Sequence, residues 1–143
     1  MAERKYRTLL TEIQKVIGKS TTTSTQLNTA GRLLLGVKFK GAWPSDAVPR
    51  LKNGDMAIAN LDGSEGPGSH WVGLAKEAGK LMVYDSFGRK AHRIIPALHR
   101  RGRIILDTEQ DAEQGKAQKN CGQRCLAALA VFQVFGAKGF MEL

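Results

Sequence analysis

The fold depends on the stretch Asn120-Cys121-Gly122-Gln123-Arg124-Cys125-Leu126-Ala127-Ala128-Leu129-Ala130-Val131-Phe132. A polar, glycine-containing segment that begins at Gln114 leads into it. The apolar residues that follow predict a helix from Gly122 to Phe135. Since this helix is apolar on most of its faces, we expect it to be buried against a sheet.

Cys121 stands at the start of this predicted helix. Unpaired backbone N–H groups at a helix start favour a thiolate and lower the pKa of the thiol. The neighbours Asn120 and Gly122 are polar or small, which leaves the thiol accessible and lets its backbone N–H point at an oxyanion. We therefore predict that Cys121 is a nucleophile, against the alternative of a buried inert cysteine. Cys125, one turn later, is expected to be buried and inert.

A nucleophilic cysteine needs a base and a group that orients the base. Two short apolar runs, Trp71–Leu74 and Leu81–Tyr84, flank the turn Lys76–Lys80 and predict a hairpin. His70 precedes the first run and Asp85 follows the second, so an antiparallel pairing brings both to one edge of the sheet. A carboxylate in that place can orient the imidazole.

The histidine, the aspartate and the oxyanion hole each have more than one candidate or role. His92 and His99 lie among arginines, which favours a surface location over a catalytic one. Asp85 has the alternative of capping a turn, as aspartate often does before Ser-Phe-Gly. A neutral glutamine can complete an oxyanion hole with the Cys121 amide, and Gln110, Gln114 and Gln118 all precede the cysteine closely enough.

Taken together, His70-Trp71, Tyr84-Asp85-Ser86-Phe87-Gly88, and Gln114 seven residues before Cys121-Gly122 resemble the adenain-like (adenovirus-type) maturation proteases. These cysteine proteases are related to the deSUMOylating Ulp enzymes. The segments Gly41–Asp46 and Gly54–Asn60 are similar to the region before the histidine in such proteases from virophages, polinton-like elements and large DNA viruses. The resemblance covers roughly residues 25 to 135.

The resemblance implies an α+β fold with N-terminal helices, a mostly antiparallel central sheet and a buried helix carrying the nucleophile. It also implies a maturation endopeptidase in the virion and infected cell, which cleaves capsid or core precursor proteins at small residues such as glycine. By its spacing it favours Gln114 for the oxyanion hole, and it gives Trp71 a supporting place close to the catalytic groups. Asp46 and Asn60 match polar positions of the family without an assigned role.

The chain departs from the family in one respect, and the same site has one alternative function. The adenovirus enzyme is activated by DNA and by a peptide that is attached through a cysteine outside the active site. Here Cys121 and Cys125 are the only cysteines, so that attachment has no anchor. A related alternative is a protease that acts on a ubiquitin-like modifier, although the short chain offers no obvious surface for one. No metal or other cofactor is expected.

Length and composition place bounds on the protein. A chain of 143 residues predicts a single domain, residues 1–143, that can bury a core without disulfides or metals. Two cysteines suit a reducing intracellular compartment. The charged N-terminus and the absence of an apolar run near ~20 residues predict neither a signal peptide nor a membrane partner.

The chain is basic, with 22 Lys and Arg against 13 Asp and Glu and a formal charge of +9. Such an excess raises the expectation of a polyanionic partner, here non-specific DNA, against the alternative of a merely solvated face. A third possibility for the function is therefore a non-enzymatic basic DNA-binding virion protein. The candidate DNA-binding residues are Arg89, Lys90, Arg93, Arg100, Arg101 and Arg103.

The remaining elements follow from periodicity and turn residues. Arg4–Ile17 predicts an amphipathic helix, and a second helix with Leu27, Ala30, Leu33 and Leu34 inward is predicted to end at Gly36 after an N-cap from the Ser/Thr-rich connector. Val37–Pro49 predicts a structured loop. Strands are predicted at Met56–Leu61 and Ile104–Asp107, and a glycine-rich loop delivers His70.

Overall fold

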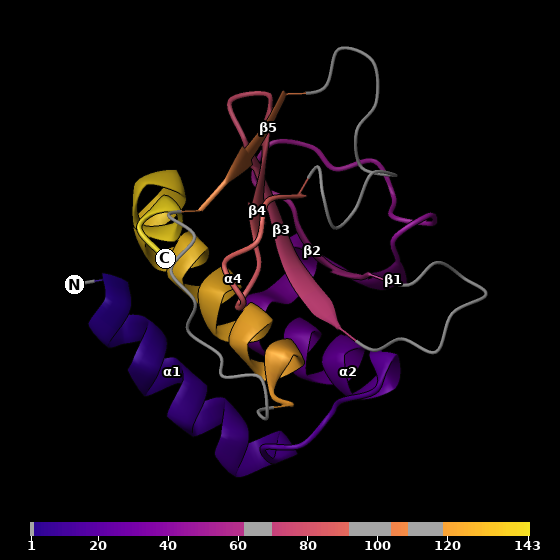
Figure 1. Cartoon of the computed structure of the whole chain (residues 1–143), viewed down its shortest axis with the longest axis vertical. Helices are drawn as coiled ribbons and strands as arrows, with labels where there is room; N and C mark the ends of the chain where they lie inside the picture. The colour runs from indigo at the N-terminus through magenta and orange to yellow at the C-terminus, as the bar shows by residue number, and fades with distance from the viewer. Residues whose placement is uncertain (1, 62–69, 92–103, 109–118) are drawn as a thin grey trace.

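The computed structural model describes residues 2–61, 70–91, 104–108 and 119–143. Within these ranges the chain is α+β, as predicted, with three α-helices and a five-stranded sheet (Figure 1). The elements are α1 (Ala2–Ile17), α2 (Ser24–Leu35), the 3-10 turn η1 (Gly36–Lys38), β1 (Phe39–Pro44), β2 (Met56–Asn60), β3 (Trp71–Glu77), β4 (Lys80–Tyr84), β5 (Ile104–Asp107) and α4 (Cys121–Met141).

The sheet is mixed, with the strand order β1-β2-β3-β4-β5. The two central pairings, β2 with β3 and β3 with β4, are antiparallel. The two outer pairings, β1 with β2 and β4 with β5, are parallel, so the sheet is not mostly antiparallel as expected. The difference arises because hairpin signals exist only at the centre, whereas each outer strand joins its neighbour through a longer connection that lets the chain return in the same direction.

The interpretation of Val37–Pro49 as a loop is wrong over Phe39–Pro44, which forms the edge strand β1. The pairing of β1 with β2 shifts register between Phe39 and Ala42, and Gly41 lies there with φ 107°. An irregular register breaks the alternation by which a strand is recognised in a sequence. Pro44 is tolerated because it ends an edge strand.

The two N-terminal helices form as predicted, although their buried faces differ in part. The side-chain oxygen of Thr23 accepts from the Gln26 backbone N–H, and the Gln26 side chain accepts from the Thr23 backbone N–H, which makes a capping box at the start of α2. Of the leucines predicted to point inward on α2, Leu27 is fully buried, but Leu33 is 84% exposed and Leu34 is 37% exposed. Val16 of α1 is 81% exposed. The apolar stripes are therefore wider than the faces that the fold covers.

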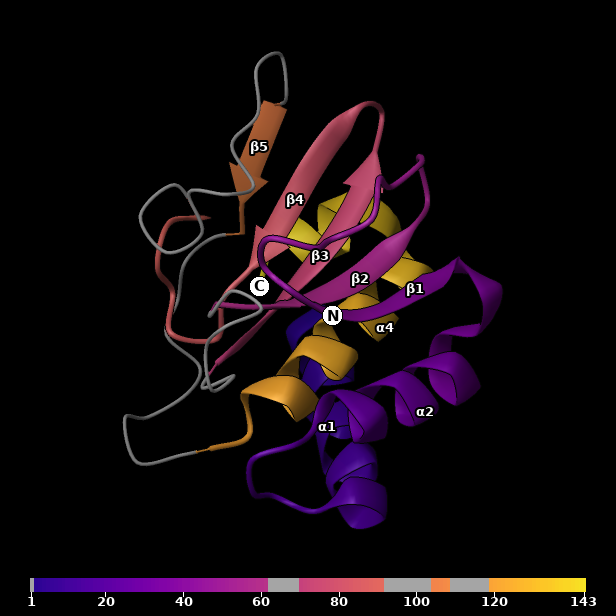
Figure 2. The same cartoon turned by 90° about the vertical axis from the view of Figure 1, so that its right-hand side faces the viewer.

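The helix α4 lies at the centre of the molecule and packs against α1, α2 and β3 (Figure 2). Every residue from Cys125 to Phe132 is buried, which confirms the predicted buried helix. The helix has the length and apolar composition of a membrane span, but 61% of that segment is buried inside the fold, as in a core helix. Its predicted end at Phe135 coincides with a kink at Gly136, beyond which it continues to Met141.

Candidate active site

His70 and Asp85 meet at one end of the β3–β4 hairpin, as the predicted pairing requires. His70 directly precedes β3 and Asp85 directly follows β4. The Nε2 atom of His70 lies 2.7 Å from Oδ1 of Asp85. Both side chains are buried, with 8% and 1% of their surface exposed. Water therefore does not compete strongly for this hydrogen bond.

The Asp85 carboxylate accepts several further hydrogen bonds from the turn that follows it. Oδ1 accepts from the Phe87 N–H at 3.2 Å, and Oδ2 accepts from the Arg89 N–H at 3.1 Å and from Arg89 Nε at 2.8 Å. Burial alone would raise the pKa of Asp85, but the hydrogen bonds from His70 and Arg89 outweigh it and lower the pKa to about 2. Asp85 is therefore an ionised acceptor at neutral pH. The turn also exists as predicted from Ser-Phe-Gly, so Asp85 both caps a turn and holds the histidine.

Phe87 and Arg89 build a layer over the histidine that sequence reasoning did not assign. The Phe87 ring stacks on the His70 ring with centroids 4.8 Å apart and planes 25° from parallel. The Arg89 guanidinium lies 5.0 Å from the centre of the Phe87 ring. Arg89, which the sequence suggested as a DNA-binding residue, is thus also part of the candidate active site. A local signal existed for Phe87, which lies in the motif Tyr84–Gly88, whereas Arg89 is the residue directly after that motif.

Cys121 is the first residue of α4 and lies beside this pair. The prediction of an accessible thiol is wrong, since Cys121 is only 4% exposed: the first turn of α4 packs against Trp71 and Thr22. Sγ of Cys121 accepts a hydrogen bond from the Trp71 backbone N–H at 3.4 Å. The His70 side chain also interacts with the thiol and favours its ionised form, which helps to lower the pKa of Cys121. Because Nε2 of His70 is held by Asp85, Nδ1 is the ring nitrogen left for the thiol. The structure thus brings Cys121, His70 and Asp85 into one row.

The protonation of the cysteine and the histidine shifts in opposite directions. Burial raises the pKa of Cys121, but the His70 hydrogen bond and charge, with the N–H groups of Trp71 and Gly122, outweigh burial and lower the pKa. Burial lowers the pKa of His70, but its hydrogen bonds with Asp85 and Cys121 outweigh burial and raise the pKa above 6.5. The two shifts favour a thiolate beside an imidazolium. Such a pair is a strong nucleophile next to a proton donor.

Cys125 has the opposite character. It is fully buried, and this burial raises the pKa of its thiol well above the ordinary value. Thiolate chemistry at this position is therefore disfavoured, which agrees with the expectation of an inert core cysteine.

Trp71 and Gly122 fix the first turn of α4 against the N-terminal helices. The indole Nε1 of Trp71 donates to the Thr22 carbonyl at 3.3 Å, while its backbone contacts the thiol. A Cβ added at Gly122 would collide with Oγ1 of Thr22 and meet Leu27 at 2.9 Å. Thr22 was not noticed in the sequence because its contact with the site depends wholly on tertiary packing.

Several predicted residues lie outside the described part of the chain, namely Gln114, Arg93, Arg100, Arg101 and Arg103. Lys90 and Asp46 are exposed, and Asn60 is buried at the end of β2. Within the described ranges, no cluster of three or more His, Cys, Asp and Glu side chains is placed to hold a metal ion.

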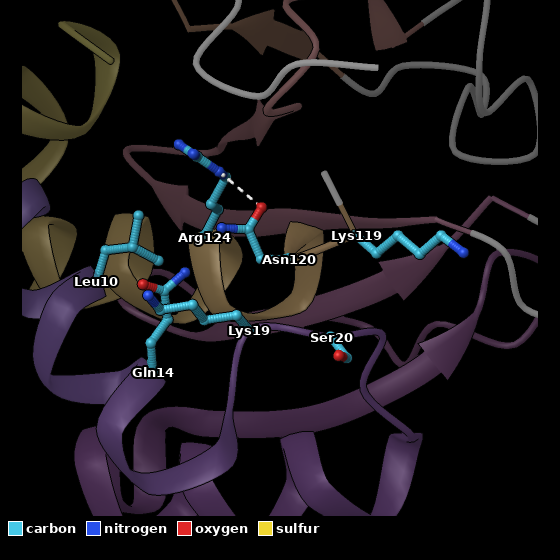
Figure 3. Close-up of a pocket in the computed structure, with 7 residues that line it drawn as sticks. All are labelled: Leu10, Gln14, Lys19, Ser20, Lys119, Asn120 and Arg124. Atoms are coloured by element: carbon cyan, nitrogen blue, oxygen red, sulfur yellow. Dashed lines mark hydrogen bonds between the residues drawn. The ribbon is translucent and has the colours of Figure 1, made fainter. Parts of the chain in front are cut away.

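A polar cavity of about 450 Å³ lies beside the start of α4, on the side of α1 (Figure 3). Asn120 and Arg124 both line it, and Nε of Arg124 donates to Oδ1 of Asn120 (Figure 3). The described residues that line it are Leu10, Gln14, Lys19, Ser20, Lys119, Asn120 and Arg124.

Comparisons of the sequence with models of protein families and with curated proteins give no match.

Proposed function

We propose that this protein is a cysteine endopeptidase with an adenain-like variant of the α+β fold. The observation that carries the proposal is the buried row of Cys121, His70 and Asp85, in which the thiol pKa is lowered and the imidazole pKa is raised. The order of these residues along the chain and their motif contexts add support through the resemblance. A buried inert cysteine would show the opposite pKa shift, as Cys125 does.

In the proposed mechanism, the Cys121 thiolate attacks the scissile carbonyl carbon and the C=O electron pair moves onto oxygen. The Cys121 N–H, and Gln114 by the family resemblance, stabilise this oxyanion, a contact of the kind worth about 3 kcal/mol. The oxyanion then collapses, the C–N bond breaks, and the His70 imidazolium gives its proton to the leaving amine. A thioester remains on Cys121.

Hydrolysis of the thioester returns the site to its starting state. His70, now neutral, takes a proton from a water molecule as the water oxygen attacks the thioester carbonyl. The C–S bond breaks, which releases the carboxylic acid product and restores the Cys121 thiolate beside an imidazolium. Asp85 stays ionised throughout and accepts a hydrogen bond from Nε2–H of His70. Nδ1 is therefore the nitrogen that gives and takes the proton.

For the substrate we propose precursor polypeptides of a viral capsid or core, cleaved next to small residues such as glycine, in the virion or the infected cell. This part rests on the motif resemblance. The alternative with the same catalytic chemistry is a protease that acts on a ubiquitin-like modifier. The two alternatives differ in their substrates, because a modifier-specific protease would need a folded one.

The test compares the wild type with Cys121→Ala on two substrate sets. One set is a library of fluorogenic peptides with glycine or alanine before the scissile bond, and the other is ubiquitin-like proteins carrying a C-terminal extension. Cleavage by the wild type and by Cys125→Ala, but not by Cys121→Ala, is the expected result. Equal activity of Cys121→Ala would overturn the proposal, and cleavage of the folded substrates alone would move it to the modifier-specific class.

A further inference from the structure

A buried hydrogen-bond network joins the start of α4 to the end of β4. Nε of Arg124 donates to Oδ1 of Asn120 at 3.0 Å, and Nη1 of Arg124 donates to the Tyr6 hydroxyl at 3.2 Å. The Tyr6 hydroxyl lies 2.7 Å from the Tyr84 hydroxyl, with which it shares a hydrogen bond. All four side chains belong to buried residues. The network therefore crosses three elements, α4, α1 and β4.

Both ends of this network stand next to the proposed catalytic residues. Asn120 is the residue before Cys121, and Tyr84 is the residue before Asp85. A shift of the helix start relative to the strand end would have to break one of the hydrogen bonds between these buried residues, and a broken hydrogen bond between buried groups is costly. The network thus holds the distance between the nucleophile and the orienting carboxylate.

The side chain of Asn120 departs from the usual behaviour of its position. Asparagine at a helix N-cap normally accepts a hydrogen bond from a backbone N–H in the first turn. Asn120 makes no such bond, because its Oδ1 accepts from Arg124 instead (Figure 3). The N–H of Gly122 is consequently available to the Cys121 thiol, whose pKa it helps to lower.

We propose that Arg124, Tyr6, Asn120 and Tyr84 are positioning residues of the active site, which set the Cys121 thiol in register with the His70–Asp85 pair. This inference rests on the proposed function for its effect on peptide cleavage. Its effect on the thiol itself is independent of any substrate. Arg124 acts by bonding to two acceptors at once, which a lysine, with one compact ammonium group, does not reproduce.

The experiment uses Tyr6→Phe and Arg124→Lys, with Val131→Ala as the matched control. Val131 is fully buried in the same helix, about two turns beyond Arg124, so its truncation destabilises α4 without removing a hydrogen bond of the network. Four quantities are measured for each protein: the melting temperature, the pH midpoint of Cys121 alkylation by iodoacetamide, and kcat and KM on a cleaved peptide. Mass spectrometry identifies the modified cysteine.

We expect both network variants to raise the alkylation midpoint toward that of a free thiol. Their kcat should fall about tenfold to a hundredfold with little change in KM, since a misplaced group costs rate and not ground-state binding. Val131→Ala should lower the melting temperature and leave the midpoint unchanged. Tyr84→Phe keeps the Arg124–Tyr6 hydrogen bond, so it should raise the alkylation midpoint and lower kcat by smaller amounts.

A wild-type midpoint and kcat in Tyr6→Phe and Arg124→Lys would overturn the inference and leave the network only a packing feature. If those two variants do not fold, Tyr84→Phe decides by the same two readings. An ordinary alkylation midpoint and no peptide cleavage in the wild type would instead defeat the proposed function, so the two failures are distinct.

Discussion

The Nε2 atom of His70 lies 2.7 Å from Oδ1 of Asp85, and this hydrogen bond closes the open end of the β3–β4 hairpin. The two residues are fifteen positions apart, so the turn between the strands places the carboxylate opposite the ring. The same contact fixes which nitrogen of the imidazole faces Cys121.

Replacement of Asp85 by Asn tests this relationship. An amide lacks the charge that favours an imidazolium and permits the wrong histidine tautomer, so we expect kcat on a cleaved peptide to fall about 10⁴-fold, as in a triad that loses its carboxylate. The exposed Asp46→Asn is the control and should keep full activity. Activity of Asp85→Asn within tenfold of the wild type would show that Asp85 only caps its turn.

The stability of the fold should also depend on Asp85 at low pH. Its pKa is about 2 in the folded protein, below the value of about 3.9 for an unfolded chain. The ionised group therefore stabilises the fold fully above pH ~4, and this contribution, about 2 kcal/mol, disappears as the pH falls toward 2. Urea unfolding at several pH values should show this loss in the wild type and a flatter profile in Asp85→Asn. Parallel profiles for the two proteins would show that ionised Asp85 does not stabilise the fold.

The two cysteines should differ sharply in reactivity. The lowered pKa of Cys121 and the raised pKa of the fully buried Cys125 predict that iodoacetamide at neutral pH modifies Cys121 first. Peptide mapping of the alkylated protein measures both rates in one sample. His70→Ala should slow the reaction of Cys121 because the imidazolium that favours its thiolate is gone. Equal alkylation rates for the two cysteines would contradict the assignment of Cys121 as the nucleophile.

Gly122→Ala should destabilise the fold by about 1–3 kcal/mol, since the added methyl collides with Thr22 and Leu27. The double variant Thr22→Ala/Gly122→Ala removes the closest obstacle, the Thr22 hydroxyl, and should recover part of the loss. Chemical unfolding of the two single variants and the double variant gives the coupling free energy. Strict additivity would indicate that the first turn of α4 moves freely away from the α1–α2 connection.

DNA binding by the candidate basic residues is tested best without replacing a residue that contacts the catalytic pair. Arg89 is unsuitable because its Nε donates to Asp85. Arg100, Arg101 and Arg103 can be replaced by Ala together, and we expect binding to unrelated duplexes to weaken equally and to depend less steeply on salt. Binding is measured at low and near-physiological salt. An unchanged salt slope would mean that these arginines form only a solvated surface.

Local signals in the sequence predicted much of the fold. The Thr23 cap, the apolar period of α1 and α4, and the hairpin around His70 and Asp85 are short-range patterns, so they could be read directly. The strand β1 was missed because its irregular register has no local pattern.

The site was predictable where its residues lie in motifs, as for His70, Asp85 and Cys121. Arg124 and Tyr6 were not found, since they are 118 residues apart and meet only through the packing of α1 on α4. The glutamine of the oxyanion hole, Gln114, stays a prediction.

The order of the elements along the chain has a consequence for biosynthesis. The helix α4 supplies the centre of the core and the cysteine, yet it follows α1, α2 and all of the described strands in the sequence. Until residues 121–141 leave the ribosome, the apolar faces that they cover have no partner, and His70 and Asp85 have no thiol beside them. The nascent chain therefore lacks the nucleophile. The proposed peptidase activity becomes possible only after α4 has docked against α1, α2 and the sheet.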